Sequence, residues 1–477
     1  MDTLSQSALH LAGQQPLTTP SLDLNNIQGD VLGGLPKKTQ TCLFFQITNT
    51  ALFKAQLKLF IPLVKTTSQV IADRKAIDDH KKKTPQGQIP ILLPMVGVNI
   101  AFSRFGMDKL GITDADALDD SAFKSGQLKD AAPNLGDKVG ADSLPDWDPA
   151  FKGKIDAVIL VAGDSHLTVS TKLLEIRALF GLSIHEVTHL QGDVRPGAVS
   201  AHEHFGFLDG VSNPSVIGFD KNPPPGPKPV RAGSILAGED GDSRAATRPG
   251  WAKDGSFLVF RKHPIIAPGL SPEDGSELRG ARMVGRWKSG APIDITPLQD
   301  DPELAADPQR NNDFRFQGER DDQSRCPFAS HVRKTLPRAD LEDADPPISL
   351  ENRRILRRGI QFGPEVTQSE KDEAKTQHGR GLLFMCYQSS IVDAFQFIQQ
   401  SWANNVDFPP FEQTPATPGF DPIIGQAGNA GIRMLSGTDP ADPNAELTLT
   451  EEFVVPRGGE YFFTPSVKSL KETFAGL

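Results

Sequence analysis

Three short segments combine residue types that could carry out redox or acid–base chemistry. Asp209 lies between Gly206 and Gly210, where an unusual backbone can hold a carboxylate at the rim of a buried pocket as a proton carrier. His331, in the segment CPFASHVRK, offers an imidazole to a metal, and Arg357, in the arginine-rich segment 353–359, offers a fixed positive charge. Each segment also has an ordinary interpretation, as a capped turn, a structural histidine or a solvated helix end. Only together do they indicate one site.

A fourth segment, from His185 to His189, matches the zinc-binding pattern HExxH. On a helix this pattern sets two imidazoles one turn apart, with the glutamate as base. The residues around it are mostly β-branched, and Gly192 and Pro196 follow, so we predict a strand instead. Residues i and i+4 of a strand share a face but lie about 13 Å apart, too far for one metal ion. A zinc hydrolase that uses His185 and His189 is therefore the least favoured function.

The 477-residue chain has a formal net charge of −10, with both signs mixed along its length. A nucleic-acid surface needs clustered Lys and Arg, so we predict no nucleic-acid partner. No segment approaches the roughly 20 consecutive apolar residues of a membrane span, and no secretory signal opens the sequence. We therefore predict no membrane partner, and a cytoplasmic location unless a leader has been removed from an extracellular protein. The oligomeric state stays open, with a homo-oligomer as one option.

The pattern of apolar residues predicts an α+β fold. The segment 218–250 is rich in Pro, Gly and charge, which is typical of a connection between packed units. We therefore expect a flexible arm over 1–25, one domain over 26–220 and a second over 221–477. The second repeats the order of elements of the first, which indicates a duplication. Expected strands are 41–48, 95–102, 156–162, 256–261, 381–388 and 460–465, and expected helices are 51–71, 167–180 and 391–403.

Several motifs resemble those of the dye-decolourising peroxidase family in their order and spacing. They are GxxDG over 206–210, CPFASHVRK over 326–334, ILRRG over 355–359 and GLLFMCYQ over 381–388. The segments NIQGD over 26–30, QGDVRPG over 191–197 and GRWKSG over 285–290 agree as well. The match covers nearly the whole ordered chain. The long insertions and the spacing from His331 to Arg357 are most similar to the fungal members.

The resemblance implies a fold, a cofactor and an activity. The fold is two ferredoxin-like domains, each an antiparallel sheet with peripheral helices, and the second holds most of one haem b. His331 would bind the haem iron, Asp209 would be the distal acid–base catalyst, and Arg357 would stabilise charge on the departing oxygen. The implied reaction reduces hydrogen peroxide and oxidises dyes, phenols and similar aromatic donors by one-electron steps. Because the reference pKa of an aspartate is about 3.9, we expect an acidic activity optimum.

The same resemblance assigns supporting residues. Leu382 and Phe384 match apolar residues that restrict the pocket above the iron. A carboxylate normally accepts the other N–H of an axial imidazole. Asp421 is the candidate for this position, and Asp393 is the alternative.

Dyes are too large for a pocket sized for peroxide, so electrons must reach the haem from the protein surface or through the haem edge. Trp402 and Tyr387 are the candidates for this transfer, although Trp402 also fits ordinary packing in an amphipathic helix. An acidic run suggests a Mn(II) site, for which a solvated loop is the alternative. The run consists of Asp340, Glu342, Asp343 and Asp345.

The main rival to a peroxidase is a haem or iron-handling protein that binds the cofactor without peroxide turnover. Such a carrier would keep its haem and its function after Asp209→Asn, whereas a peroxidase would keep its haem and lose the reaction with peroxide.

Overall fold

The computed structural model describes residues 21–85, 91–265, 277–319, 322–373, 375–410 and 417–477. Most of the arm expected over 1–25 therefore lies outside the described residues. The paired strands of the described chain are antiparallel and helices pack beside them, so the prediction of an α+β fold is confirmed.

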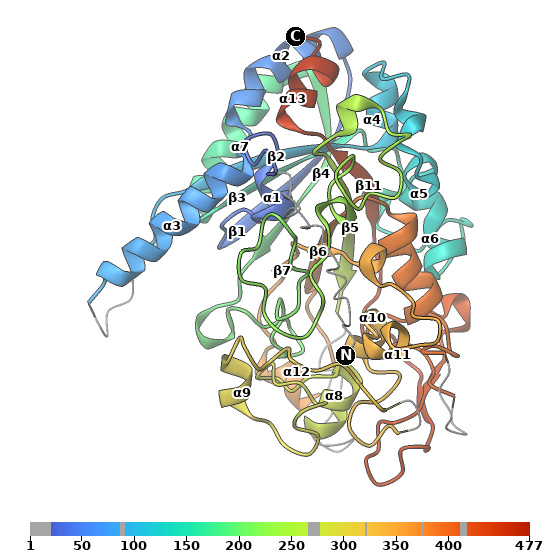
Figure 1. Cartoon of the computed structure of the whole chain (residues 1–477). Coiled ribbons are helices and arrows are strands. Elements are labelled where there is room, and N and C mark those ends of the chain that lie inside the picture. Colours follow the sequence, from blue (N-terminus) through green and yellow to red (C-terminus); the bar gives the residue numbers. More distant parts are fainter. Residues whose placement is uncertain (1–20, 86–90, 266–276, 320–321, 374, 411–416) are drawn as a thin grey trace, which may run out of the picture.

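The first half of the chain forms a four-stranded antiparallel sheet with helices on one face (Figure 1). The strand order is β4-β1-β3-β2. α2 and α7 pack on one face through stacked phenylalanines, with the Phe53 and Phe180 ring centroids 5.1 Å apart. This order with two helical crossovers is the ferredoxin-like arrangement. The elements are β1 (Thr39–Ile47), α2 (Thr50–Phe60), α3 (Thr67–Lys83), β2 (Val96–Phe102), β3 (Ala157–Gly163), α7 (His166–Phe180) and β4 (Ile184–Asp193).

One predicted helix, over 51–71, is two helices in the structure. Pro62 lies in a short 3-10 turn, Ile61–Leu63, that follows α2. Proline has no backbone N–H to continue an α-helix and favours a helix start or a turn. A capping box, in which Thr66 and Gln69 bond to each other's backbone N–H, then begins α3. α3 projects away from the rest of the molecule (Figure 1).

The second half repeats the same strand order, β11-β5-β8 followed by β6 and β7, which both pair with β8. Its crossover helix, after β8, is mainly π-helical over Val392–Gln396 and Ile398–Ala403. The predictions of duplication and of two ferredoxin-like units are thus confirmed, whereas the boundary at 220 and 221 stays a prediction. The strands are β5 (Ser256–Pro264), β6 (Leu356–Arg357), β7 (Ile360–Phe362), β8 (Gly381–Gln388) and β11 (Gly459–Thr464).

The two half-sheets join into one sheet that curls around a shared core. β2 and β11 pair at Phe102 and Phe463, so the strand path is continuous. The inward faces of both halves contribute to one buried cluster, in which Phe44 of β1 meets Phe260 of β5 with ring centroids 4.7 Å apart. At the far edges, β4 reaches β7, where Gly192 lies directly against Ile360. The two ferredoxin-like halves therefore close toward a barrel.

The long segment between β5 and β6 contains short helices and loops in the lower part of Figure 1. It supplies one wall of the cavity described below. No helix among the described residues is long and apolar enough to cross a membrane. The remaining helices and strands are α1 (Gly29–Leu32), α4 (Arg104–Lys109), α5 (Ser121–Ser125), α6 (Gln127–Leu135), α8 (Glu277–Val284), α9 (Pro302–Ala306), α10 (His331–Thr335), α11 (Ala339–Glu342), α12 (Gln368–Asp372), β9 (Arg433–Leu435), β10 (Leu447–Leu449) and α13 (Val467–Ser469).

The HExxH segment lies in β4, so the prediction of a strand is confirmed. A bulge shifts the register next to Val187: Glu186 pairs with Phe45, but Thr188 pairs with Phe44. One extra residue reverses the alternation, so His185 and His189 lie on opposite faces rather than on one face as expected. Glu186 and His189 share a face and hydrogen bond at 2.6 Å. Within the described residues, no group of three or more His, Cys, Asp or Glu is arranged to hold a metal ion.

Candidate functional site

A cavity lies on the outer face of β8, on the side away from the shared core. Side chains alternate along a strand, so Leu382 and Phe384 face the cavity while Tyr387 faces the core with Leu383 and Met385. The crossover helix after β8 supplies Phe395, Ile398 and Gln399 to the wall. The loop over 203–214, α10 and the arginine-rich segment before β6 complete it.

The loop that carries Asp209 is held by its own glutamate. The Glu203 carboxylate accepts hydrogen bonds from the N–H groups of Phe205 (2.6 Å) and Phe207 (2.9 Å). Gly206 has a φ of 96°, a left-handed value that suits glycine and lets the loop turn sharply. Burial raises the pKa of Glu203 to about 7, with the amides of Phe205 and Phe207 opposing the rise and the charge of Asp209 adding to it. The loop thereby presents Asp209 to the cavity.

Asp209 and Arg357 form an ion pair at the cavity wall. Nη1 of Arg357 donates to Oδ1 of Asp209 at 2.7 Å, and the N–H of Gly210 donates to the same oxygen at 2.6 Å. No described group hydrogen bonds to Oδ2 of Asp209. The side chain of Asp209 is 32% exposed, so Oδ2 is free to bind a small molecule in the cavity. Asn213 fixes the arginine, because its Oδ1 accepts the backbone N–H of Arg357 at 3.0 Å.

The charge state of Asp209 follows from these contacts. Burial alone would raise the pKa of its carboxyl. The positive charge of Arg357 and the N–H of Gly210 outweigh that effect, and the net pKa is lowered from its ordinary value. Asp209 is therefore an ionised base, and it remains one in mildly acidic solution.

On another wall, His331 is the first residue of α10 and is oriented by a buried carboxylate. Its Nδ1 lies 2.8 Å from Oδ2 of Asp421, which is completely buried. Burial opposes ionisation of Asp421, but His331 and the N–H groups of Ile423 and Ile424 leave the net pKa lowered. A carboxylate that accepts from Nδ1–H places the free lone pair on Nε2. His331 is thus prepared to bind a metal through Nε2. Asp393, the alternative partner, pairs with Arg244 and Arg353 instead.

Comparisons with known proteins agree with this geometry. Residues 26–196 match the family model described as the DyP dimeric alpha+beta barrel domain, and residues 201–408 match the Dyp-type peroxidase C-terminal model. A dye-decolorizing peroxidase of Mycena epipterygia is 41% identical over 487 aligned positions, which cover 94% of this chain and 86% of that protein. The chain belongs to the dye-decolourising peroxidase family.

Solved structures of dye-decolourising peroxidases share the fold. A variant of the Pleurotus ostreatus enzyme is 55% identical with a TM-score of 0.90, and the match covers 96% of this chain and 100% of that one. A family member in complex with 2,6-dimethoxyphenol is 42% identical with a TM-score of 0.82, over 95% of this chain and 100% of that one. Near-complete coverage on both sides extends the likeness to the whole molecule. This chain is therefore a peroxidase of the dye-decolourising type.

Dye-decolourising peroxidases use haem, and the cavity has the chemistry to hold it. Five arginines line it against two carboxylates, Glu203 and Asp209. Burial lowers the pKa of Arg286 and Arg354 to about 10, and burial together with the charges of Arg286 and Arg354 lowers that of Arg338 well below its usual range. Nε of Arg338 is buried without a hydrogen-bond partner. Such an excess of buried cations fits the two propionate carboxylates of a haem b, and Nε2 of His331 fits its iron.

The two residues expected to transfer electrons lie in different places. Trp402 is 3% exposed and stacks on Phe408, with ring centroids 5.2 Å apart and planes at 14°. It lies in the helix that lines the cavity through Ile398 and Gln399, so it remains a candidate. Tyr387 is completely buried on the opposite face of β8 and donates to Oδ2 of Asp30 at 3.0 Å. This position does not favour Tyr387 as an electron donor.

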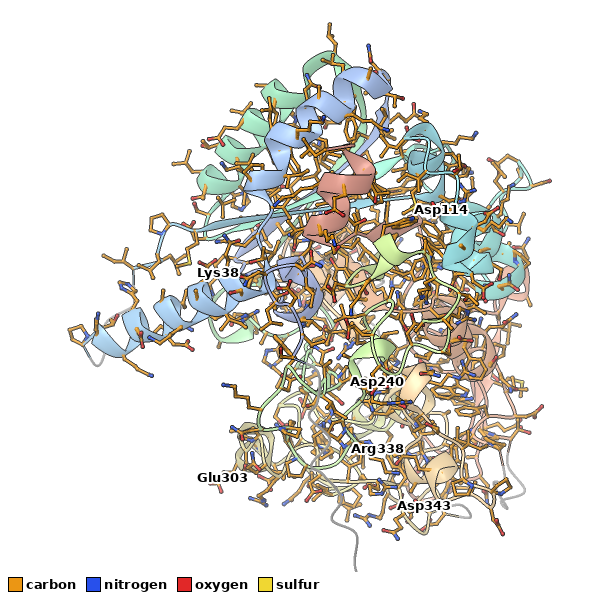
Figure 2. The ribbon with its side chains drawn as sticks, turned by 45° about the horizontal axis from the view of Figure 1, so that its top comes forward. Lys38, Asp114, Asp240, Glu303, Arg338 and Asp343 are labelled. Carbon is orange, nitrogen blue, oxygen red and sulfur yellow. The ribbon has the colours of Figure 1, made fainter. Side chains whose placement is uncertain are left out.

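The acidic run proposed for Mn(II) is largely paired with basic side chains. Asp340 is buried against Arg333, and Glu342 and Asp343 both contact Arg315 at 3.0 Å. Figure 2 shows Asp343 near the lower edge of the molecule, with Arg338 further in. The geometry therefore gives no support to a Mn(II) site in this run.

Sequence reasoning missed several residues that shape the site. Glu203 and Asn213 flank the GxxDG motif but bind backbone groups, and that role depends on how the loop folds. His263 and Arg286 reach the cavity from β5 and from the segment after α8. The GRWKSG motif contains Arg286 and was the one sequence signal for that residue.

Proposed function

We propose that this chain is a haem b peroxidase in which His331 binds the iron, Asp209 is the acid–base catalyst and Arg357 is the electrostatic catalyst. The observation that carries the proposal is that an imidazole with a free Nε2 and an arginine-paired carboxylate line one cavity. Bound haem would supply the iron that receives peroxide and the electrons that reduce it. Arg286, Arg338 and Arg354 would hold the propionates.

The residues of this chain would then move one proton. Oδ2 of Asp209 would take a proton from one oxygen of hydrogen peroxide and pass it to the other oxygen, which leaves as water. Oδ1 would stay bound to Arg357 and Gly210, so the carboxylate keeps its orientation during the transfer. Arg357 would stabilise the negative charge that develops on the departing oxygen. Leu382 and Phe384 would exclude molecules larger than hydrogen peroxide from the part of the cavity next to Asp209.

Hydrogen peroxide and aromatic one-electron donors are the proposed substrates. The phenol complex of a family member supports this class of donor. A phenol or dye would give its electron at the cavity edge or through Trp402.

The reaction with peroxide tests the proposal. The haem-loaded protein should show a Soret band that shifts with one equivalent of hydrogen peroxide and returns when an electron donor is added. Asp209→Asn should keep the resting spectrum and slow the shift by about 10²- to 10⁴-fold, because general acid–base catalysis is lost. Asp193→Asn, which changes an exposed carboxylate of β4, is the matched control and should react as the wild type does. A haem carrier would show normal haem binding in both variants and no peroxide-dependent shift in any form of the protein.

A further inference from the structure

A chain of hydrogen bonds runs from Trp147 to the cavity. Nε1 of Trp147 donates to Oδ2 of Asp137 at 2.8 Å. Nη2 of Arg261 donates to both oxygens of the same carboxylate, at 2.7 Å each. Nε of Arg261 then donates to Nε2 of His263 at 3.1 Å, and His263 lines the cavity. Three side chains therefore connect the indole to the proposed haem site.

Three of these four side chains are buried. Trp147, Asp137 and Arg261 are 4%, 3% and 2% exposed. A buried ion pair is tolerated when its geometry is good and its other hydrogen-bonding positions are filled. Here the indole N–H fills one of them, and the Arg261 guanidinium also lies over the Trp147 ring, 6.0 Å from its centroid. The four groups are thus held in a fixed arrangement, in which Nη1 of Arg261 is buried with no hydrogen-bond partner among the described residues.

At the cavity end, the protonation of His263 is determined by its partner. A guanidinium only donates, so Nε2 of His263 accepts and the ring proton lies on Nδ1. Burial, together with the charge of Arg261, lowers the pKa of His263 well below its usual range, so the ring stays neutral. The ring stacks on Phe384, with centroids 5.6 Å apart. His263 and Phe384 therefore line the site from this side as a stacked pair.

Trp147 differs from the other oxidisable aromatic residues of the chain. Four of them donate to a carboxylate: Trp147 to Asp137, Trp251 to Asp114, Tyr387 to Asp30 and Tyr461 to Asp130. Among these carboxylates, and within the described residues, Asp137 alone is also ion-paired with an arginine. That arginine contacts a cavity residue. At the outer end, the neighbours Asp146 and Asp148 are 51% and 38% exposed, so solvent lies one residue from the indole.

We propose that Trp147 is a second point at which aromatic donors deliver electrons, separate from the cavity and from Trp402. This inference rests on the proposed haem peroxidase function. One electron leaves the indole for the peroxide-oxidised cofactor, and the N–H proton moves to Oδ2 of Asp137. A phenol at the surface then gives one electron to the indole and its own proton to solvent. Asp137 returns its proton to Nε1, which restores Trp147.

Peroxide without a donor should mark Trp147 covalently. A second electron would then leave the indole radical and water would add, so that one tryptophan and one hydrogen peroxide give hydroxytryptophan and water. Tryptic peptide 139–152 contains Trp147 and no other Trp, Tyr, Met or Cys. In the haem-loaded wild type it should gain one oxygen, and excess phenol should suppress the gain at least tenfold. Peptide 245–253, which contains Trp251, is the internal control and should stay unmodified.

Radical spectroscopy provides a test in variants. After Trp402→Phe, mixing with peroxide should still give a tryptophan radical by electron paramagnetic resonance. Adding Trp147→Phe should remove that signal, and adding Trp251→Phe should leave it. Asp137→Asn should weaken the signal at least tenfold, because the indole proton loses its acceptor.

The two proposals fail in different ways. The peroxide-dependent Soret shift of the wild type is recorded first and tests the haem peroxidase function. If that shift occurs while peptide 139–152 stays unmodified, or while the radical persists in the Trp402→Phe/Trp147→Phe double variant, Trp147 is not an entry point and the peroxidase function stands.

Discussion

At the scale of single residues, the two oxygens of Asp209 have different roles. Oδ1 is held by Arg357 and Gly210, whereas Oδ2 has no described partner. A carboxylate with one fixed and one free oxygen can move a proton without turning. The sequence predicted which residues meet, since Asp209, His331 and Arg357 were chosen from their motifs and line one cavity.

The ion pair between Arg357 and Asp209 should set how the reaction with peroxide depends on pH. The proposed reaction uses the base form of Asp209, and the pKa of Asp209 is lowered because Arg357 and Gly210 outweigh burial. The rate of reaction with peroxide should therefore fall only at a pH below the ordinary range of an aspartate. In Arg357→Ala, burial is less opposed, the pKa of Asp209 rises and the acid limb of the rate profile moves to higher pH.

Stopped-flow rates from pH 3 to 7 measure this shift, and the maximal rate should also drop by about 10²- to 10³-fold from lost charge stabilisation. Arg457→Ala is the control, because Arg457 is an exposed arginine that pairs with Asp146 and does not line the cavity. An acid limb at the same pH in Arg357→Ala and in the wild type would show that Arg357 does not set the ionisation of Asp209.

Other residues of the site could not be predicted from the sequence. Asn213 and His263 act through contacts with Arg357 and Arg261, which are 144 and 2 positions away along the chain. Nothing in the type or spacing of Asn213 shows that the fold brings it to Arg357, and the strand predicted over 256–261 ended before His263. The motifs identified the residues that we propose to react, whereas the residues that hold them in place could be identified only from the tertiary structure.

At the scale of elements, His331 and its carboxylate partner come from a short helix and a loop. α10 begins at His331, and the loop after Asp421 turns two N–H groups, of Ile423 and Ile424, onto Oδ1 of that carboxylate. Oδ2 is thereby left for the imidazole. The sequence offered two carboxylates here, Asp421 and Asp393, and only the fold of this loop distinguishes them.

Asp421→Asn tests that arrangement. An amide keeps the shape of the side chain but loses the charge that makes His331 a stronger ligand, so haem affinity should fall by about 10- to 100-fold. Titration of the haem-free protein with hemin measures the affinity. Asp393→Asn should bind haem as the wild type does, because Asp393 pairs with Arg244 and Arg353. Equal affinities in Asp421→Asn and the wild type would remove Asp421 from the proximal site.

Secondary structure was predicted well where apolar strands are long and poorly where they are short. The bounds of β8 were predicted without error, because Gly381–Gln388 is an apolar run that faces both the core and the cavity. β6 has two residues and β7 has three, too few to show any alternation. A solvated helix end was therefore the ordinary interpretation of segment 353–359. The segment instead contains the strand β6, which carries Arg357.

At the scale of the whole molecule, closure of the sheet is a property that no local pattern showed. A Cβ on Gly192 would lie 2.5 Å from Cγ2 of Ile360 and 2.6 Å from the carbonyl oxygen of Gln361. Only a residue without a side chain lets β4 approach β7 this closely. The strand β6, which carries Arg357 into the cavity wall, directly precedes β7 in the sequence.

Gly192→Ala should therefore destabilise the protein by about 1–3 kcal/mol, the usual cost of overpacking a tight interior. The free energy of unfolding from a denaturant titration measures the effect. Gly153→Ala is the matched control, since its Cβ would have nothing within 4 Å, and it should change the stability by less than about 0.5 kcal/mol. Equal stabilities of the two variants would mean that the edges of the sheet do not meet as described.

The central claim is that one haem lies between His331 and Asp209. A crystal structure of the haem-loaded protein, with anomalous diffraction collected at the iron absorption edge, tests it most directly. We expect a single iron peak at bonding distance from Nε2 of His331, with Asp209 and Arg357 on the other side of the porphyrin plane. An iron bound by any other side chain, or a porphyrin with Asp209 on the same side as His331, would contradict it.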